Sequence, residues 1–285
     1  MTLTEHRVRL PFALPPGSRD AVLVEGPCGW GEWSPLPGYP SDPAACRRAA
    51  EEAATAPWPP AVRTRVRVNG LVPAIGADAA AALAARWADV KVKVGDAGDI
   101  DRVAAVRDAI GPHGRLRVDA NGAWDVEAAV ATIARLAPFD LELVEQPVAS
   151  LDDLAAVRRR VAVPVAADEC VRDLDDARRL AVLDSADALV VKVQPLGGLA
   201  ATLEIIAAAG VVAIVSSMFE TSVGLAAGLA LAAALDELPF ACGLGTAGLF
   251  ADDVVDDPLV AVDGWLTVRR PVPTPDRLAR YEVGG

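Results

Sequence analysis

Five charged residues recur at near-constant intervals inside apolar segments, and their types could do chemistry together. They are Lys93 in VKVKVG, Asp119 in LRVDANG, Glu145 in LELVEQP, Asp168 in VAADEC and Lys192 in LVVKVQPLGG. The intervals are 26, 26, 23 and 24 residues, and each has the length of one strand plus one helix. Charges among Val, Leu and Ala side chains are costly to bury unless they are paired or bound to metal. The repeated arrangement therefore predicts a functional site.

The elements that must position these residues alternate regularly from about residue 68 onward. Asp125, Ser150 and Asp173 stand where the N-caps of three intervening helices are expected. Eight strands that alternate with helices predict an α/β fold, a (β/α)8 TIM-like barrel. A doubly wound open sheet is the competing fold, but it requires a Gly-rich phosphate loop after its first strand, and NGLVPAIGAD offers none. The predicted strands are 68–74, 89–95, 115–121, 141–146, 163–169, 188–194, 212–218 and 241–246.

The two ends of the chain have a different pattern. Residues 1–65 contain a short antiparallel meander with Gly/Pro turns and a helical stretch at 43–56. Residues 268–285 contain a Pro-rich turn and a short helix. We expect these ends to form a small α+β capping domain (1–65 joined by 268–285) beside a barrel of residues 66–267.

Three carboxylates should form one group at the mouth of such a barrel. Asp119, Glu145 and Asp168 fall at the C-terminal ends of three successive strands, where barrel active sites lie. Neighbouring strands are about 4.8 Å apart, so three bare negative charges would repel one another. A hard divalent cation with oxygen ligands, Mg²⁺ above all, resolves this repulsion, and Mn²⁺ is a possible substitute. No His or Cys joins the group, which disfavours zinc.

Two lysines could then move a proton. In VKVKVG the valines face the helices, so Lys91 and Lys93 point inward. Strands two and six lie on opposite sides of an eight-stranded ring, so Lys93 and Lys192 are expected to face each other. Lys91 gives Lys93 a like-charged neighbour, which favours the neutral amine that a base requires. Lysine with Mg²⁺ suits proton abstraction beside a carboxylate.

Each signal has an ordinary interpretation when it is taken alone. A single acidic residue at a strand end is usually a helix cap or a surface ion pair, and a Lys-x-Lys pair is usually a solvated edge. Five such residues in register, in the order Lys, Asp, Glu, Asp, Lys, are much harder to explain in this way. A catalytically silent barrel that acts as a binding or scaffold protein is the alternative from another class.

Composition limits the partners. The chain has 285 residues, 53% of them hydrophobic, and a net charge of −12. An acidic surface argues against nucleic acid and anionic membranes as partners. We expect a small-molecule substrate and a cytoplasmic protein with no signal peptide and four reduced cysteines. The oligomeric state is not predicted.

The chain resembles the enolase superfamily in its muconate-lactonizing branch, and within that branch the o-succinylbenzoate synthases. The resemblance covers nearly the whole length, and its motifs are GWGEWSPLPGY, KVKVG, VDANGAW, VEQP, ADEC, VKVQPLGG, SSMFETSVGLAAGLALA and GLGTAGLF. It implies a lyase of menaquinone biosynthesis that dehydrates 2-succinyl-6-hydroxy-2,4-cyclohexadiene-1-carboxylate to 2-succinylbenzoate. An N-acylamino acid racemase or a cycloisomerase of the same superfamily remains the alternative.

The resemblance also implies roles for individual residues. Asp119, Glu145 and Asp168 would hold Mg²⁺. Lys93 would be the base and then the acid, and Lys192 would stabilise the intermediate. The expected supporting or substrate-binding residues are Lys91, Asn121, Glu169, Ser216, Ser217, Met218, Gly243, Gly245 and Thr246. The segment before the barrel is shorter than in most of the superfamily, which places specificity rather than chemistry in question.

Overall fold

The computed structural model describes residues 3–284, and these divide into two compact units. The first unit contains residues up to 68, 191–204 and 215 onward, and the second contains residues 69–190 and 205–214. The four cysteines are free thiols. Among residues 3–284, no helix has both the length and the apolar character needed to cross a bilayer.

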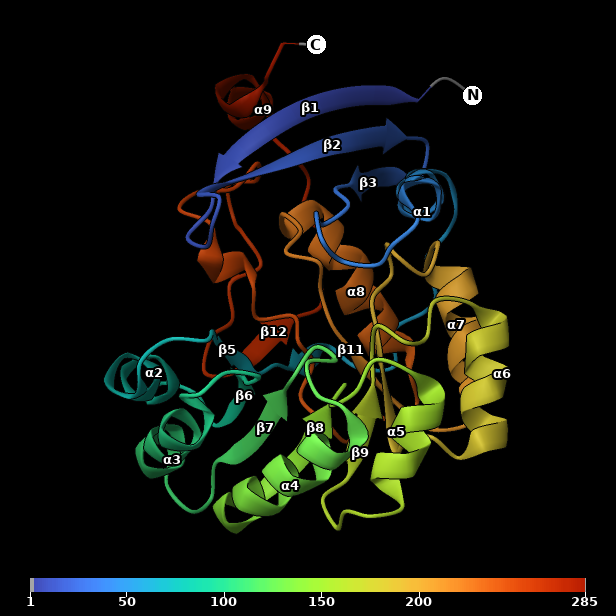
Figure 1. Ribbon diagram of the computed structural model, residues 1–285. Coiled ribbons are helices and arrows are strands. Elements are labelled where there is room, and N and C mark those ends of the chain that lie inside the picture. The colour runs from blue at the N-terminus through green and yellow to red at the C-terminus, as the bar shows by residue number, and fades with distance from the viewer. Residues whose placement is uncertain (1–2, 285) are drawn as a thin grey trace. The chain divides into compact units, whose positions relative to one another are not determined.

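The second unit is a parallel sheet with helices between its strands (Figure 1). The sheet order is β11-β10-β9-β8-β7-β6-β5, so every strand lies beside its neighbour in sequence. The strands are β5 (Gly70–Val72), β6 (Asp89–Lys93), β7 (Arg115–Asp119), β8 (Leu141–Glu145), β9 (Val165–Ala167), β10 (Ala188–Val191) and β11 (Val212–Val215). The helices are α2 (Ala77–Ala84), α3 (Asp99–Ile110), α4 (Val126–Leu136), α5 (Leu151–Arg158), α6 (Leu174–Leu183) and α7 (Leu199–Ala209), and a 3₁₀ turn follows α4 at Ala137–Phe139. Residues 199–204 of α7 belong to the first unit.

Local sequence explains where these helices begin. The side chain of Asp125 accepts the Ala128 N–H at the start of α4, and Ser150 accepts the Asp153 N–H at the start of α5. Asp173 accepts two N–H groups at the start of α6. These bonds satisfy donors that have no partner within the helix. The three predicted N-caps are confirmed.

The first unit contains the N-terminal meander. Strands β1 (Thr4–Pro11), β2 (Ser18–Gly26) and β3 (Gly29–Trp33) pair antiparallel, and α1 (Pro43–Thr55) packs against them. Gly31 allows the close contact, because a Cβ there would lie 2.0 Å from the Ala50 carbonyl oxygen. The remaining elements are β4 (Arg65–Arg67), α8 (Ser222–Ala234), a 3₁₀ turn (Ala247–Leu249), β12 (Trp265–Thr267), which pairs with β4, and α9 (Pro275–Tyr281).

The eighth predicted barrel strand differs from expectation. Residues 241–246 form two isolated parallel bridges, Val68 with Cys242 and Ser216 with Gly243, followed by a turn. A Cβ at Gly243 would lie 2.4 Å from the Ser216 hydroxyl oxygen, so glycine is needed for this close approach. The segment is therefore a short bridged stretch rather than a strand of six residues. The predicted boundary between cap and barrel stays a prediction.

Candidate active site

The ends of β6, β7 and β8 bring two lysines onto two buried carboxylates. Lys91 Nζ lies 2.8 Å from Asp119 Oδ2 and 2.7 Å from Glu145 Oε1. Lys93 Nζ lies 2.6 Å from the same Asp119 oxygen. The strand register places Lys93 beside Asp119 and Asp119 beside Glu145. The Lys93 side chain is 27% exposed and that of Lys91 only 11%, so Lys93 is the more accessible of the two lysines.

A second layer of hydrogen bonds holds this group. Asn121 Oδ1 accepts from Lys93 Nζ at 2.6 Å, and Asn121 Nδ2 donates to Glu169 Oε1 at 2.6 Å. The Asn121 backbone N–H donates to Asp119 Oδ1, the oxygen that the lysines do not use. Asn121 thereby links the base candidate to the segment that follows β9. The structure thus brings together Lys91, Lys93, Asp119, Asn121, Glu145 and Glu169, six residues expected at the site.

Asp168 follows β9 directly and is 4% exposed. Its backbone N–H donates to Gln146 Oε1 at 2.7 Å, and Gln146 Nε2 donates to the Val148 carbonyl. Gln146 is itself 1% exposed with a φ of 40°. Gln146, which follows the predicted metal ligand Glu145, therefore fixes the backbone of a second predicted ligand, Asp168. The sequence analysis did not single out Gln146, although its place beside Glu145 in VEQP was a signal.

In this cluster, burial and ion pairing have opposite effects on the pKa of Asp119. Burial alone would raise the pKa of Asp119, but the Lys91 and Lys93 ammonium groups hold that pKa well below its usual range. Asp119 is therefore an anion at neutral pH. The sequence predicted that Lys91 would act on Lys93 as a like charge, but it did not predict that both ammonium groups share one oxygen of Asp119.

The donor chemistry of the cluster fits a hard divalent cation. Asp119, Glu145 and Asp168 offer only carboxylate oxygens, all three are at most 4% exposed, and they come from successive strand ends. Across residues 3–284, no three His, Cys, Asp or Glu side chains are arranged as they stand to hold a metal ion. The lysine ammonium groups supply the positive charge at Asp119 and Glu145. The metal site stays a prediction.

Lys192 lies in the first unit, directly after β10, and is 7% exposed. Its Nζ lies 3.2 Å from the Tyr39 hydroxyl oxygen and 4.6 Å from the centre of the Tyr39 ring. A cation over an aromatic face is stabilised by the negative charge of that face. The contact with Tyr39, a residue of the PLPGYPSD segment, was not predicted.

The predicted pocket residues of the first unit are joined by hydroxyl contacts. Ser217 Oγ donates to the Gly243 carbonyl at 2.9 Å and lies 3.0 Å from Thr246 Oγ1. The Met218 N–H donates to Glu220 Oε2 at 2.7 Å. Ser216 takes part in the bridge to Gly243, and Gly245 lies in the turn that precedes Thr246.

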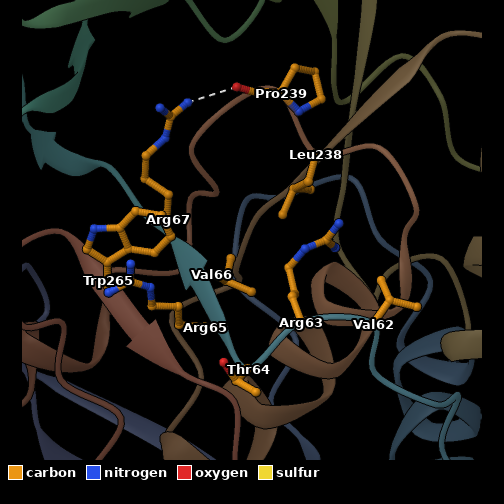
Figure 2. A pocket seen from close by; sticks show the side chains of 9 residues that line it. All are labelled: Val62, Arg63, Thr64, Arg65, Val66, Arg67, Leu238, Pro239 and Trp265. Atoms are coloured by element: carbon orange, nitrogen blue, oxygen red, sulfur yellow. Dashed lines mark hydrogen bonds between the residues drawn. The ribbon is translucent and has the colours of Figure 1, made fainter.

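A cavity of about 560 Å³ lies elsewhere in the first unit, beside β4 and β12 (Figure 2). The Arg65 guanidinium lies 4.4 Å from the centre of the Trp265 ring, and Arg67 donates to the Pro239 carbonyl at 2.8 Å. None of the nine residues drawn in Figure 2 is Lys, Asp or Glu. The lining therefore offers no base, and none of the predicted site residues belongs to it.

Comparisons with known proteins agree with this organisation. The family model described as Enolase C-terminal domain-like matches residues 74–274, and the Enolase N-terminal domain-like model matches residues 17–54. An o-succinylbenzoate synthase of Thermobifida fusca is 52% identical over 275 residues, which are 93% of this chain and 86% of that protein.

Two solved structures share the fold. The muconate lactonizing enzyme of Pseudomonas putida has a TM-score of 0.86 at 21% identity and covers 99% of both chains. An N-succinyl Arg/Lys racemase of Bacillus cereus has a TM-score of 0.86 at 19% identity and covers 100% of this chain and 99% of its own. These similarities confirm the predicted fold class, a (β/α)8 barrel with a capping domain. The chain therefore belongs to the enolase superfamily and is a homologue of bacterial o-succinylbenzoate synthases, which are lyases.

Proposed function

We propose that the protein is a Mg²⁺-dependent o-succinylbenzoate synthase of menaquinone biosynthesis. Its reaction would convert 2-succinyl-6-hydroxy-2,4-cyclohexadiene-1-carboxylate to 2-succinylbenzoate with loss of one water. The Thermobifida fusca relative carries that name and shares half of its residues with this chain. The observation that carries the proposal is the contact of Lys93 with both Asp119 and Asn121 at the ends of neighbouring strands.

The distribution of lysine supports this assignment. The chain has 27 Lys and Arg residues, and only Lys91, Lys93 and Lys192 are lysines. Arginine stays protonated at all accessible pH values, whereas lysine can lose its proton and act as a base. All three lysines are among the residues that the sequence predicted for the site. Lysine is therefore confined to the positions where the proposed chemistry needs it.

Lys93 performs the proton transfers in the proposed reaction. Its ammonium group would first release a proton to solvent, and the amine so formed would then take the proton from the ring carbon that bears the carboxylate. The ammonium group so formed then gives a proton to the leaving hydroxyl at the neighbouring carbon, and water departs as the ring becomes aromatic. Asp119 and Asn121 orient Nζ through their 2.6 Å contacts. Lys192 contributes a fixed positive charge that favours the anionic intermediate.

Asp119, Glu145 and Asp168 would hold the cation in this proposal. The chemistry that a bound Mg²⁺ supplies is positive charge for the substrate carboxylate as negative charge develops on it. Gln146 keeps Asp168 in place through the backbone contact at 2.7 Å. Lys91 contacts both Asp119 and Glu145, and Lys93 contacts Asp119, so these lysines lie beside two of the residues that would hold the cation.

The state of Asp252 favours an acidic substrate without an ammonium group. It is the first acidic residue after Glu237, and segment 241–251 has none. Asp252 accepts hydrogen bonds from the Tyr281 hydroxyl, Arg277 and Arg280 of α9. The Tyr281 hydrogen bond above all, together with the Asp253 N–H and Arg277, lowers the pKa of Asp252 to about 2. Asp252 is therefore engaged in structure. A dipeptide epimerase would need a carboxylate in segment 241–251 to bind the substrate amino group, and this chain has none there.

A direct assay tests the proposed function. We expect the protein to convert the cyclohexadiene substrate with the absorbance change of ring aromatisation, and we expect a chelator to stop the reaction and Mg²⁺ to restore it. The same preparation should be given N-succinyl amino acids in deuterated water. Fast inversion of these amino acids without dehydration of the diene would assign the protein to the racemases. Absence of both reactions and of α-proton exchange would indicate a silent barrel.

A further inference from the structure

A buried polar cluster in the first unit connects three segments that are distant in sequence. It joins Glu32 and Ser34 at the end of β3, Gln194 two residues after Lys192, and Glu220 with Thr221 before α8. These five side chains are between 0% and 4% exposed. Polar groups at this depth are stabilising only when each has its hydrogen-bond partner. The hydrogen-bond partners of each group in the cluster therefore define its orientation.

The side-chain amide of Gln194 uses its oxygen and both of its N–H bonds. Gln194 Oε1 accepts the Ser34 backbone N–H at 2.9 Å. Nε2 donates to Ser34 Oγ at 3.1 Å and to Glu220 Oε1 at 3.2 Å. Because the Ser34 backbone N–H can only donate, it requires the amide oxygen on its side, and the amide has one allowed orientation.

Glu32 fixes the same cluster from the other side. One of its oxygens accepts from Ser34 Oγ at 2.7 Å and from the Thr221 N–H at 3.2 Å. The other accepts from Thr221 Oγ1 at 2.5 Å and from the Gly224 N–H at 3.0 Å. Glu32 thus places carboxyl oxygens at the N-terminal end of α8, where they accept the N–H groups of Thr221 and Gly224. Ser34 and Glu220 are thereby held where Gln194 needs them.

Arg19 ties the adjoining segments to this cluster. Its guanidinium, 6% exposed, donates to the carbonyls of Ser34 and Pro35 and to those of Met218 and Phe219. Segment 34–39, which begins at this anchor, ends at the Tyr39 that contacts Lys192. The turn after Lys192 is closed by three backbone bonds: Leu196 N–H to the Lys192 carbonyl at 3.4 Å, Gly197 N–H to the Gln194 carbonyl at 3.1 Å and Gly198 N–H to the Val193 carbonyl at 3.0 Å.

We propose that Gln194 is a positioning residue for Lys192: its amide, locked by Ser34 and Glu220, fixes the turn that carries the lysine. Ser34 begins the segment that leads to Tyr39, so one anchor sets both the backbone of Lys192 and the aromatic face beside its ammonium group. The inference rests on the proposed function, because Lys192 needs a fixed position only in a reaction that uses its charge.

The test compares Gln194→Met with Ser185→Ala. Methionine keeps the length of glutamine but removes its three hydrogen bonds. Ser185, a residue of the second unit, is 0% exposed and donates to the Leu151 carbonyl, so its variant also loses a buried hydrogen bond outside the unit that contains the cluster. We expect Gln194→Met to lower kcat for the diene substrate by about 10- to 100-fold with KM nearly unchanged. Ser185→Ala should keep the wild-type kcat.

A second readout does not depend on turnover. Protein labelled with [13Cε]lysine gives three lysine resonances, and Lys192→Arg identifies the one from Lys192. In Gln194→Met this resonance should move while those of Lys91 and Lys93 stay. An unmoved Lys192 resonance, a wild-type kcat, or movement of all three resonances would overturn the inference. If the wild-type protein does not turn over the diene but the Lys192 resonance alone moves, the positioning contact stands and the proposed function fails.

Discussion

At the scale of single residues, Asp168 tests the proposed metal site, because Gln146 holds its backbone independently of its side chain. Asp168→Asn removes one negative oxygen ligand and keeps the backbone bond to Gln146. We expect Mg²⁺ affinity, measured by calorimetric titration, to fall by about tenfold or more. Asp173→Asn, the same change five residues later at a helix N-cap, is the control. Equal affinity in the wild type and Asp168→Asn would remove Asp168 from the ligand set.

The identity of the site residues could be predicted from sequence, but their contacts could not. Strand ends and alternation place Lys93, Asp119 and Glu145 together because parallel strands align their ends. No such rule says that Lys91 and Lys93 share one oxygen of Asp119. That choice depends on side-chain torsions and on which oxygen Asn121 already occupies.

At the scale of elements, the start of α8 depends on a carboxyl group from β3. Burial raises the pKa of Glu32 to about 7, against the opposing effect of hydrogen bonds from Thr221 and Ser34. A carboxyl whose pKa is raised by folding stabilises the folded state fully below pH 4.5, and this contribution is lost as pH rises through about 7. Glu220, also buried and with a raised pKa, and Arg19 are the charged groups that act on it.

This linkage predicts how stability depends on pH. The free energy of unfolding of the wild type should fall relative to that of Glu32→Gln between pH 4.5 and 8, by on the order of 3 kcal/mol. Chemical denaturation at several pH values measures both curves. Glu32→Gln also loses hydrogen bonds and is expected to be less stable throughout, so the difference in slope is the readout. Parallel curves would show that Glu32 is ionised in the folded and unfolded states alike.

Helix α6 offers a test of local sequence rules. Asp173 accepts the N–H groups of Asp175 and Asp176 at the start of the helix. Asp173→Ala should lower the free energy of unfolding by about 1 kcal/mol, and Asp173→Asn, which keeps a capping oxygen, should stay near the wild type. Denaturant melts of both variants give the comparison. A similar loss in the two would assign the effect to charge rather than to the cap.

At the scale of the whole molecule, the alternation of strands and helices could be predicted from sequence because each strand and the helix after it are neighbours in the chain. The predicted strands from 89 to 146 match β6, β7 and β8 to within two residues at their ends. Segment 241–246 was predicted too long, since its alternation is that of a strand but Gly243 and Gly245 favour a turn. The contact of Glu32 with Thr221 spans 189 residues, and no periodicity in a single sequence reports a pairing over that distance.

Kinetic and binding measurements on Lys93→Ala test the central claim most directly. The account predicts that this variant loses all measurable turnover of the cyclohexadiene substrate and all α-proton exchange. Its Mg²⁺ affinity, measured by calorimetry, should be at least as high as that of the wild type, because the substitution removes a positive charge beside Asp119. Turnover at the wild-type rate would contradict the assignment of Lys93 as the base and, with it, the lysine chemistry proposed for this protein.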